Sequence, residues 1–493
     1  MRALARMDHK NSRLVGDIVP RENLESCTDS SESGLKTSTG ALLFHQGMRG
    51  IQKPPYKVEH RYPVAQQEML KEDGISMSTR GKILVLWNQV EDDIYEKWRE
   101  EGPRKLEWNP EQEVPDVGTV AEEMAEFIDA LKAARFEVIL VNVRDDLATL
   151  MSAVTLHRPD AVFNLVEYFH DDPMFEAYVA GLFELMGVSY TGNRPFTLAT
   201  CQNKYRTKLL LEAAELPTAE FFLASKLPVH DDHELSFPLI VKPAYEDASG
   251  GIEPASVVQN QAELEARVAH VIKEFEMPAL VEEYIEGREI HVAVLGNNPP
   301  EVLPLFEMEF DDSEFNPDDE WRPQIISFRA KWDPHSKDFY TMDAVVPPED
   351  LDPDVEEEIR EVAVEAFKAV QARDYVRIDM RVDEDGQPFI LEVNPNPDLT
   401  NGAAYSMCAT ASGRTYADAV ATIADLAVAR GMKVWRNTAD KALPSDQLLR
   451  EFVKEKQAGG TGSPTDVQPV PATTEAEKVP QAVGNETFTR AAE

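Results

Sequence analysis

Two acidic side chains lie opposite each other in a hairpin that the sequence predicts towards its C-terminal end. The segments Val376–Val382 and Phe389–Asn394 alternate in polarity on either side of Asp385-Gly386, a dipeptide typical of a tight hairpin turn. With a two-residue turn at this dipeptide, Asp379 lies directly opposite Glu392. Two carboxylates in these positions repel each other and destabilise the hairpin unless a cation lies between them.

The two faces of the predicted hairpin differ in chemistry. In the same register Arg377 lies opposite Asn394, and both share the face of Asp379 and Glu392, because side chains alternate between faces along a strand. Asp, Glu and Asn offer only oxygen, the ligand set of Mg²⁺ rather than of zinc. The sequence therefore predicts a magnesium site, with a solvated charged face as the alternative. The residues expected on the opposite, core-forming face are Ile378, Met380, Val382, Phe389, Leu391 and Val393.

Three charged residues upstream are candidates for binding a nucleotide. Lys242 ends an apolar strand, where its charge is costly without an anion, and precedes Glu246–Gly251, whose Ser-Gly-Gly part can present N–H groups to phosphate oxygens. Glu282 and Glu289 can each bind ribose hydroxyls or an exocyclic amine. Taken alone, these residues are better explained by salt bridges and a solvent-exposed turn. Neither the Walker A nor the dinucleotide-binding glycine spacing is present.

The sequence between residues 79 and 195 predicts a small domain with a doubly wound parallel sheet. Continuous apolar strands alternate with helix-length segments in β-α-β-α-β order, and a capping box of Thr119 with Glu122 opens the first helix. The predicted elements are the strands Lys82–Trp87, Glu137–Val143 and Ala161–Val166 and the helix Thr119–Ala134.

The rest of the ordered chain combines helices with shorter strands, and both ends of the chain differ in composition. The predicted helices are Asn203–Glu215, Gln261–Phe275, Asp354–Ala372 and Thr415–Arg430, and the predicted strands are Pro238–Tyr245, Ala279–Ile285 and Glu289–Leu295. Residues 1–78 are rich in Ser, Thr, Gly and charge, and the chain beyond about residue 448 is rich in Gly, Pro, Thr and Glu. We expect disorder in both regions.

Composition restricts the partners and the compartment. The 493 residues are enough for two or three domains, and the formal net charge of −40 argues against nucleic acid and against an anionic membrane surface as partners. The three cysteines match no zinc or disulfide spacing, and no 18-residue apolar run is present. We therefore expect a protein of the reducing cytoplasm.

Seven segments resemble, in family order, motifs of the ATP-grasp superfamily and of its D-alanine–D-alanine ligase-like branch. The resemblance covers roughly residues 160–430. The segments are YTGN at 190–193, NKYRTKLLLEAAELPT at 203–218, PLIVKP at 238–243, VEEYIEGREIHVAVL at 281–295, RAKW at 329–332, VRIDMRVD at 376–383 and LEVNPNP at 391–397.

The resemblance implies an α/β (α+β) protein with an ATP-grasp fold, preceded by the small doubly wound domain; the disordered termini are expected from composition. The implied boundaries are 1–78 for the extension, 79–195 for the N-terminal domain, 196–285 for the small ATP-grasp subdomain, 286–432 for the large subdomain with the metal site, and 433–493 for a helix remnant and disordered tail.

The resemblance also implies roles for individual residues in binding ATP and two Mg²⁺ (or Mn²⁺) ions. The nucleotide positions are Lys204 and Lys242 at the phosphates, Glu282, Glu283, Tyr284 and Ile285 at the adenine, and Glu289 at the ribose. The remaining positions are Asp379, Glu392 and Asn394 at the metal ions, Arg377 at the acyl phosphate and tetrahedral intermediate, Ser249 in the loop over the phosphates, and Lys331 in the lid.

Two departures from the D-alanine–D-alanine ligase pattern limit what the resemblance implies about the substrate. Asp398 stands where those ligases have glycine, and their His-Gly signature is missing. Glu167 follows the third strand, at the edge where open α/β sheets bind ligands, and is a candidate contact for a substrate amine, as is Asp398. His170, nearby, is interpreted as a solvent-exposed loop residue. The acidic region Glu307–Lys337 is either a lid or a solvated loop.

The leading hypothesis is an ATP- and Mg²⁺-dependent, ADP-forming ligase that joins amino acids, or an amino acid and a small amine, through an acyl phosphate. The alternatives are a genuine D-alanine–D-alanine ligase, an ATP-grasp phosphotransferase, and a non-catalytic nucleotide-binding regulator. The expected partners are small molecules, and a homodimer is a family expectation only.

Overall fold

The computed structural model describes residues 79–90 and 118–431, except for residue 232 and residues 312–320, together with scattered positions between residues 91 and 117. The predicted disordered extension 1–78 and the tail 433–493 lie outside the described residues. No helix in the described part of the chain is long and apolar enough to cross a membrane.

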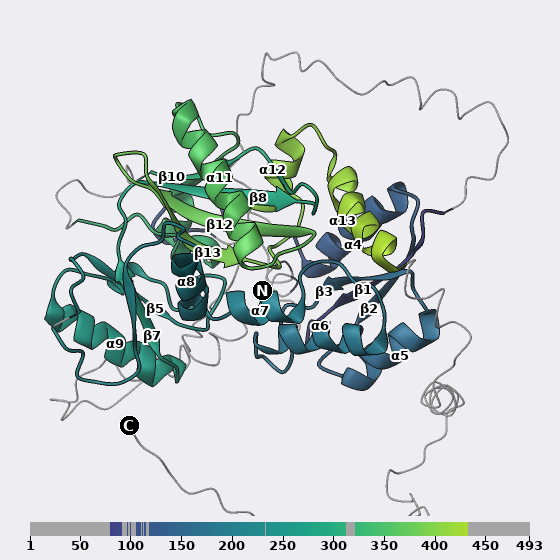
Figure 1. Cartoon of the computed structure of the whole chain (residues 1–493), viewed down its shortest axis with the longest axis horizontal. Coiled ribbons are helices and arrows are strands. Elements are labelled where there is room, and N and C mark those ends of the chain that lie inside the picture. Colours follow the sequence, from purple (N-terminus) through teal and green to yellow (C-terminus); the bar gives the residue numbers. More distant parts are fainter. Residues whose placement is uncertain are drawn as a thin grey trace, which may run out of the picture. The chain divides into compact units, whose positions relative to one another are not determined.

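A parallel sheet in the order β2-β1-β3 forms the N-terminal domain (Figure 1). Its strands are β1 (Lys82–Trp87), β2 (Glu137–Asn142) and β3 (Ala161–Leu165). The strands are apolar on both sides because both faces are covered. Helices α5 (Leu147–His157) and α6 (Phe175–Met186) pack on one face, and α4 (Val120–Ala133) and α13 (Tyr416–Gly431) pack on the other. The predicted doubly wound domain is confirmed, as is the capping box of α4.

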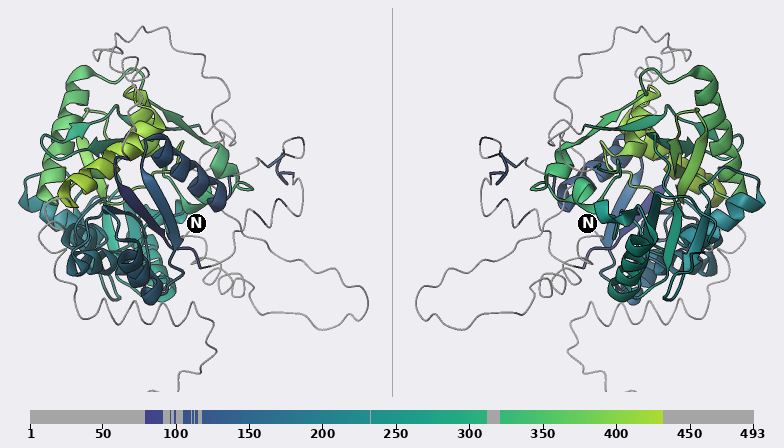
Figure 2. Two further views of the ribbon diagram at one scale, coloured as in Figure 1. Left: turned by 90° about the vertical axis from the view of Figure 1, so that its right-hand side faces the viewer. Right: turned by 90° about the vertical axis from the view of Figure 1, so that its left-hand side faces the viewer.

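The last described helix, α13, returns to this N-terminal sheet. It lies against α4 and β3, so the two ends of the described chain share one core (Figure 2). A buried ion pair fastens it: both oxygens of Asp374, which is 0% exposed, accept hydrogen bonds from Arg430, at 2.5 and 2.6 Å. The same carboxylate accepts bonds of 3.0 Å from the backbone N–H of Gly192 and from the side chain of Asn297. Asp374 thus joins three segments to α13.

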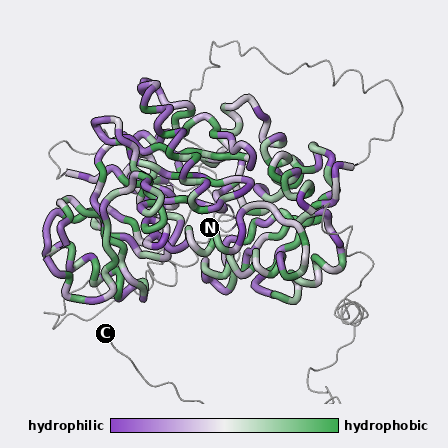
Figure 3. Tube along the Cα trace, viewed as in Figure 1, coloured by the Kyte–Doolittle hydropathy of each residue, from purple (hydrophilic) through white to green (hydrophobic). Residues whose placement is uncertain are grey.

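An antiparallel sheet in the order β4-β7-β5-β6 follows. The elements of this region are α7 (Pro195–Cys201), α8 (Lys204–Ala213), β4 (Phe221–Ala224), β5 (Leu239–Pro243), a 3-10 turn (Pro254–Ser256), β6 (Val257–Val258), α9 (Gln261–Phe275) and β7 (Ala279–Glu283). Helix α9 covers one face of this sheet with its apolar side. In Figure 3 hydrophobic (green) and hydrophilic (purple) residues alternate along this helix. The opposite face of β5 and β7 bears Lys242 and Glu282, which strand alternation leaves uncovered by α9.

A larger sheet, in the order β11-β10-β8-β12-β13 with β9 paired to β8, forms the rest of the described chain. Its elements are β8 (Arg288–Leu295), β9 (Glu301–Val302), β10 (Phe306–Phe310), α10 (Phe328–Trp332), a 3-10 turn (Lys337–Tyr340), β11 (Met342–Val345), α11 (Pro353–Ala369), β12 (Tyr375–Val382), β13 (Pro388–Asn394) and α12 (Ala404–Ala411). Helix α11 packs on one face, against Ile378, Met380 and Val382, which lie on the core side of the strand as predicted.

The turn of the β12–β13 hairpin differs from the prediction. Residues 384–386 form a three-residue turn instead of a two-residue one, with Asp383 N–H donating to the carbonyl of Gln387 at 3.1 Å and Gly386 at a φ of 85°. The Asp383 carboxylate explains the wider turn, because it accepts the backbone N–H groups of Asp385 and Gln387 at 3.0 and 2.8 Å.

A β-bulge at Leu391 compensates for the extra turn residue. Beyond the bulge, Asp379 lies opposite Glu392 and Arg377 opposite Asn394. The predicted pairs are therefore confirmed, although a three-residue turn and a bulge produce them instead of a two-residue turn. Within the bulged part the prediction of the core was wrong. Ile390 packs in the core under α11, Phe389 is only half-buried, and Leu391, at the bulge, lies outside that core cluster and lines a cavity.

The ion pair of α13 leads to a testable prediction. Arg430→Met leaves the fully buried Asp374 without a cation and should lower the free energy of unfolding by about 3 kcal/mol. The matched control is Arg414→Met, whose partner Glu301 is half exposed, with an expected loss of below about 1 kcal/mol. Equal losses in the two variants, measured by denaturant unfolding, would contradict the clamping role of Asp374.

Candidate functional site

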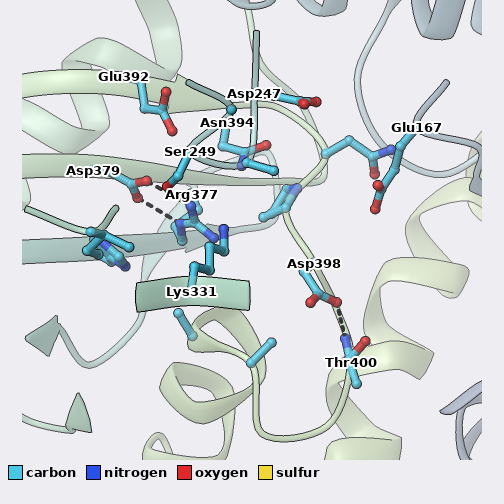
Figure 4. A pocket seen from close by; sticks show the side chains of 18 of the residues that line it. Glu167, Asp247, Ser249, Lys331, Arg377, Asp379, Glu392, Asn394, Asp398 and Thr400 are labelled. Carbon is cyan, nitrogen blue, oxygen red and sulfur yellow. Dashed lines mark hydrogen bonds and ion pairs between the residues drawn. The ribbon is translucent and has the colours of Figure 1, made fainter. Parts of the chain in front are cut away.

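The face of the large sheet opposite α11 forms the floor of a cavity of about 600 Å³. Strand β12 directs Arg377 and Asp379 into it, and β13 directs Glu392 and Asn394 (Figure 4). All fifteen residues predicted for the site line this one cavity. They are Glu167, Lys204, Lys242, Ser249, Glu282, Glu283, Tyr284, Ile285, Glu289, Lys331, Arg377, Asp379, Glu392, Asn394 and Asp398.

Each floor carboxylate has a cationic partner. The Arg377 guanidinium donates to both oxygens of Asp379, at 2.7 and 2.8 Å, and the Lys204 ammonium, from the first turn of α8, pairs with Glu392. Burial alone would raise the pKa of both carboxyls, but Arg377 and Lys204 hold the pKa of Asp379 and of Glu392 below their usual values. The opposed carboxylates are therefore ionised, and the cations offset their mutual repulsion.

A second buried carboxylate, Glu282 on β7, has two lysine partners. Its side chain is 1% exposed, with the Lys208 ammonium 2.7 Å from Oε2 and the Lys242 ammonium paired with Oε1. Lys208 also donates to Thr218 Oγ1 at 2.6 Å. Against the effect of burial, the two lysines lower the pKa of Glu282. Lys208 was not predicted as a site residue, although its position one turn after Lys204 indicated it.

The hinge between the two antiparallel sheets forms another wall. Glu283, Tyr284 and Ile285 line the cavity where β7 ends, and Glu289 follows at the start of β8. Arg381, which was not predicted as a site residue, is paired with Glu289 at 2.8 Å and also lines the cavity. The alternation that brings Arg377 and Asp379 to this face of β12 applies equally to Arg381.

Two loops cover the cavity and are bonded to each other. Ala248 and Ser249 have φ values of 49° and 62°. The indole N–H of Trp332 donates to the carbonyl of Ala248 at 2.9 Å, and the Phe328 N–H donates to the carbonyl of Ile252 at 2.9 Å. Part of the acidic region, around Lys331, thus lies in the cavity wall, while residues 312–320 lie outside the described residues.

Lys331 extends into the cavity towards Arg377 (Figure 4). Its burial, followed by the neighbouring Arg377 charge, lowers the pKa of the Lys331 ammonium. Both cations line the same cavity, which is a suitable environment for an anionic ligand.

The wall on the side of the N-terminal domain is acidic. Glu167 lies at the carboxyl end of β3, as predicted from strand order, and Asp398 lies beyond β13, where one of its oxygens accepts the Thr400 N–H at 2.8 Å. The side chain of His170 is 64% exposed and is not part of the cavity wall, as predicted.

The predicted magnesium ligands fit a hard cation. Within the described ranges no group of three His, Cys, Asp or Glu side chains is arranged around a metal position, and the predicted set consists of two carboxylates and the amide of Asn394. All three side chains supply oxygen from paired strands, and both carboxylates are ionised. Such donors suit Mg²⁺.

Comparison with known proteins agrees with the motifs. Residues 210–425 match the family model described as the D-ala D-ala ligase C-terminus. An uncharacterized protein, y4sG, of Sinorhizobium fredii is 35% identical over 270 residues, which cover 54% of this chain and 74% of that protein. The D-alanine–D-alanine ligase of Desulforudis audaxviator is 30% identical over 318 residues, which cover 61% of this chain and 91% of that ligase.

Solved structures show the same fold. The D-alanine–D-alanine ligase of Bacillus anthracis, in a structure described as complexed with ATP, superimposes with a TM-score of 0.52 at 20% identity, over 72% of this chain and 99% of that chain. The predicted fold class and the resemblance are thereby confirmed. From its match to nearly the whole of a ligase sequence, this chain belongs to the D-alanine–D-alanine ligase family of the ATP-grasp superfamily, whose members are ATP-dependent, ADP-forming ligases that make C–N bonds.

Proposed function

We propose that this chain is an ATP- and Mg²⁺-dependent carboxylate–amine ligase that joins amino acids, or an amino acid and a small amine, through an acyl phosphate. One observation carries the proposal: a single cavity brings Lys204, Lys242, Lys331 and Arg377 together with the oxygen donors of β12 and β13. Family membership supports the use of ATP and the formation of a C–N bond.

In the proposed reaction an oxygen of the substrate carboxylate attacks the γ-phosphorus of ATP, and ADP leaves. The amine nitrogen of the second substrate then attacks the acyl carbon, loses a proton, and displaces phosphate. Lys204 and Lys242 would bind the phosphates, and Arg377 and Lys331 would stabilise negative charge on the transferred group. Asp379, Glu392 and Asn394 would hold Mg²⁺, which neutralises phosphate charge when bound.

The covering loops would protect the acyl phosphate. The Trp332 and Phe328 hydrogen bonds hold the segment bearing Lys331 against the segment bearing Ser249. Exclusion of water by such a cover prevents hydrolysis of a reactive intermediate before the amine arrives.

The acidic wall of the cavity indicates where the ammonium group of a substrate would bind. We infer that Glu167 and Asp398 contact the ammonium group of an amino-acid substrate, since both line the cavity beyond Arg377. Synthesis of D-alanyl-D-alanine is the second candidate, favoured by family membership and disfavoured by Asp398 in place of glycine. A cytoplasmic location and a homodimer stay predictions.

The reaction class can be tested with pooled substrates. Purified protein with ATP, Mg²⁺ and mixtures of D- and L-amino acids should release ADP and phosphate only when particular amino acids are present. Mass spectrometry should detect a product heavier than either substrate. Formation of AMP and pyrophosphate would rule out the proposed chemistry, and ADP release without a joined product would favour a phosphotransferase.

The floor of the cavity yields a second prediction. Glu392→Gln keeps the size of the side chain but removes a charge that we assign to Mg²⁺ binding, and turnover should fall at least about 100-fold. The control Glu384→Gln lies in the exposed hairpin turn and should leave turnover unchanged. Thermal unfolding of both variants separates lost activity from lost folding; a folded Glu392→Gln protein with normal turnover would refute the assignment.

The buried Glu282 yields a prediction about stability and pH. Glu282→Gln leaves the Lys208 charge buried without a counter-charge, which should cost about 3 kcal/mol of unfolding free energy. Because the folded pKa of Glu282 lies below its ordinary value of 4.5, this contribution is complete above that pH and is lost on further acidification. Denaturant unfolding from pH 7 to pH 3 should show the gap to wild type narrowing only below about pH 4.5. The control Glu286→Gln, at an exposed position, should show no gap.

A further inference from the structure

One buried cation of the cavity has no role in the function proposed above. Arg381 is 3% exposed, lies on β12 directly opposite Glu289 on β8, and faces the cavity. Burying a guanidinium is costly unless its charge and its donors are matched. Its partners therefore indicate what it does.

The guanidinium of Arg381 is held on three sides. It forms an ion pair of 2.8 Å with Glu289 Oε2, donates to the carbonyl of Gly287 at 2.9 Å, and donates to the carbonyl of Gln324 in the covering segment. The Tyr284 hydroxyl donates to that same Gln324 carbonyl at 3.1 Å. The guanidinium of Arg381 thus joins Glu289 to the backbone of Gly287 and to the backbone of Gln324.

The position of Gly287 is fixed by a close approach to β12. Its φ is 139°, and a Cβ atom there would lie 2.0 Å from the carbonyl oxygen of Val382. No side chain fits in that space, so the hinge backbone can reach the end of β12 only with glycine. The Gly287 carbonyl is thereby brought within reach of Arg381.

Glu289 is held ionised and oriented by its neighbours. Burial would raise the pKa of Glu289, but Arg381 is the strongest influence in the opposite direction, and the net pKa lies below the usual value. His291 Nε2 lies 3.3 Å from Oε1, and Arg381 occupies the side of Oε2. An ionised carboxylate has further lone pairs on both oxygens, which can accept hydrogen bonds from hydroxyl groups of a ligand in the cavity.

We propose that Arg381 is a positioning residue that holds Glu289 in the orientation that accepts the hydroxyl groups of the nucleotide ribose, and so sets the preference for ribose over deoxyribose nucleotides. This inference rests on the ATP-binding function proposed above. Arg381 acts through Glu289 and need not touch the nucleotide. A purely structural ion pair would stabilise the fold but would not alter discrimination at the ribose.

The test is equilibrium binding, which requires no turnover and no knowledge of the other substrates. Titration calorimetry measures the affinities of wild type, Arg381→Met and Glu289→Gln for ATP, 2′-deoxy-ATP and 3′-deoxy-ATP. Wild type should bind ATP at least about tenfold more tightly than one of the deoxy analogues, as expected for a hydrogen bond to a charged group. Both variants should bind ATP and that analogue with nearly equal affinity.

A matched control separates positioning from general stability. Arg288→Met removes a neighbouring arginine of the same sheet, which pairs with Glu307 and is not part of the cavity wall. This variant should keep the wild-type ratio of the affinity for ATP to the affinity for the deoxy analogue. If Arg381→Met does not fold, Arg381→Gln, which keeps donor groups without the charge, provides the same comparison.

The outcomes distinguish the two proposals. A wild-type ratio retained by a folded Arg381 variant would overturn the positioning role and leave ATP binding intact. Wild type that binds ATP and both analogues equally would also overturn it. Wild type that binds none of the three nucleotides would overturn the proposed function, and this inference with it.

Discussion

Pairing of buried carboxylates with cations is the constraint on which this site depends. Asp379 with Arg377, Glu392 with Lys204, and Glu282 with two lysines all lie in or beside one cavity. In a chain with a net charge of −40, each of these carboxylates would be driven to protonate by burial if its partner were absent. Compensation keeps the acceptor oxygens ionised and keeps the cations near the place where an anionic ligand would bind.

Strand β12 makes this pairing compatible with a stable fold. Its residues are buried on both faces: Ile378 and Met380 pack under α11, while Arg377 and Asp379 face the cavity. The apolar face supplies free energy that holds the strand between β8 and β13, and the polar face is turned to the cavity. Side chains on a strand that is paired on both sides are well positioned, which favours preorganised charge stabilisation.

The sequence predicted the elements better than their junctions. Periodicity located β12, β13 and α9 because each has one apolar face, and ordered motifs identified the cavity residues. The predicted length of the hairpin turn was wrong because the Asp383 carboxylate stabilises a longer turn. The alternation of polar and apolar residues does not show such a hydrogen bond between a side chain and the backbone. The bulge at Leu391 restored the pairing of the functional residues but changed which residues reach the core.

Missed site residues have a common physical reason. Lys208 and Arg381 act through contacts with Glu282 and Glu289, which lie far away in the sequence. Local spacing placed both residues beside predicted site residues, but it could not show these distant partners. The packing of α13 on the N-terminal sheet was likewise hidden, because it joins segments more than 200 residues apart through Arg430 and Tyr190. Charged residues on the ligand-facing side of a predicted strand are the signal that could have indicated Arg381.

In the proposed reaction, ATP activates a carboxylate as an acyl phosphate. The most direct measurement uses the carboxylate substrate that supports turnover, labelled with ¹⁸O in its carboxyl group, and follows the released phosphate by ³¹P NMR. The proposed reaction transfers one ¹⁸O atom to inorganic phosphate for each C–N bond formed. Unlabelled phosphate, or label in AMP, would contradict it.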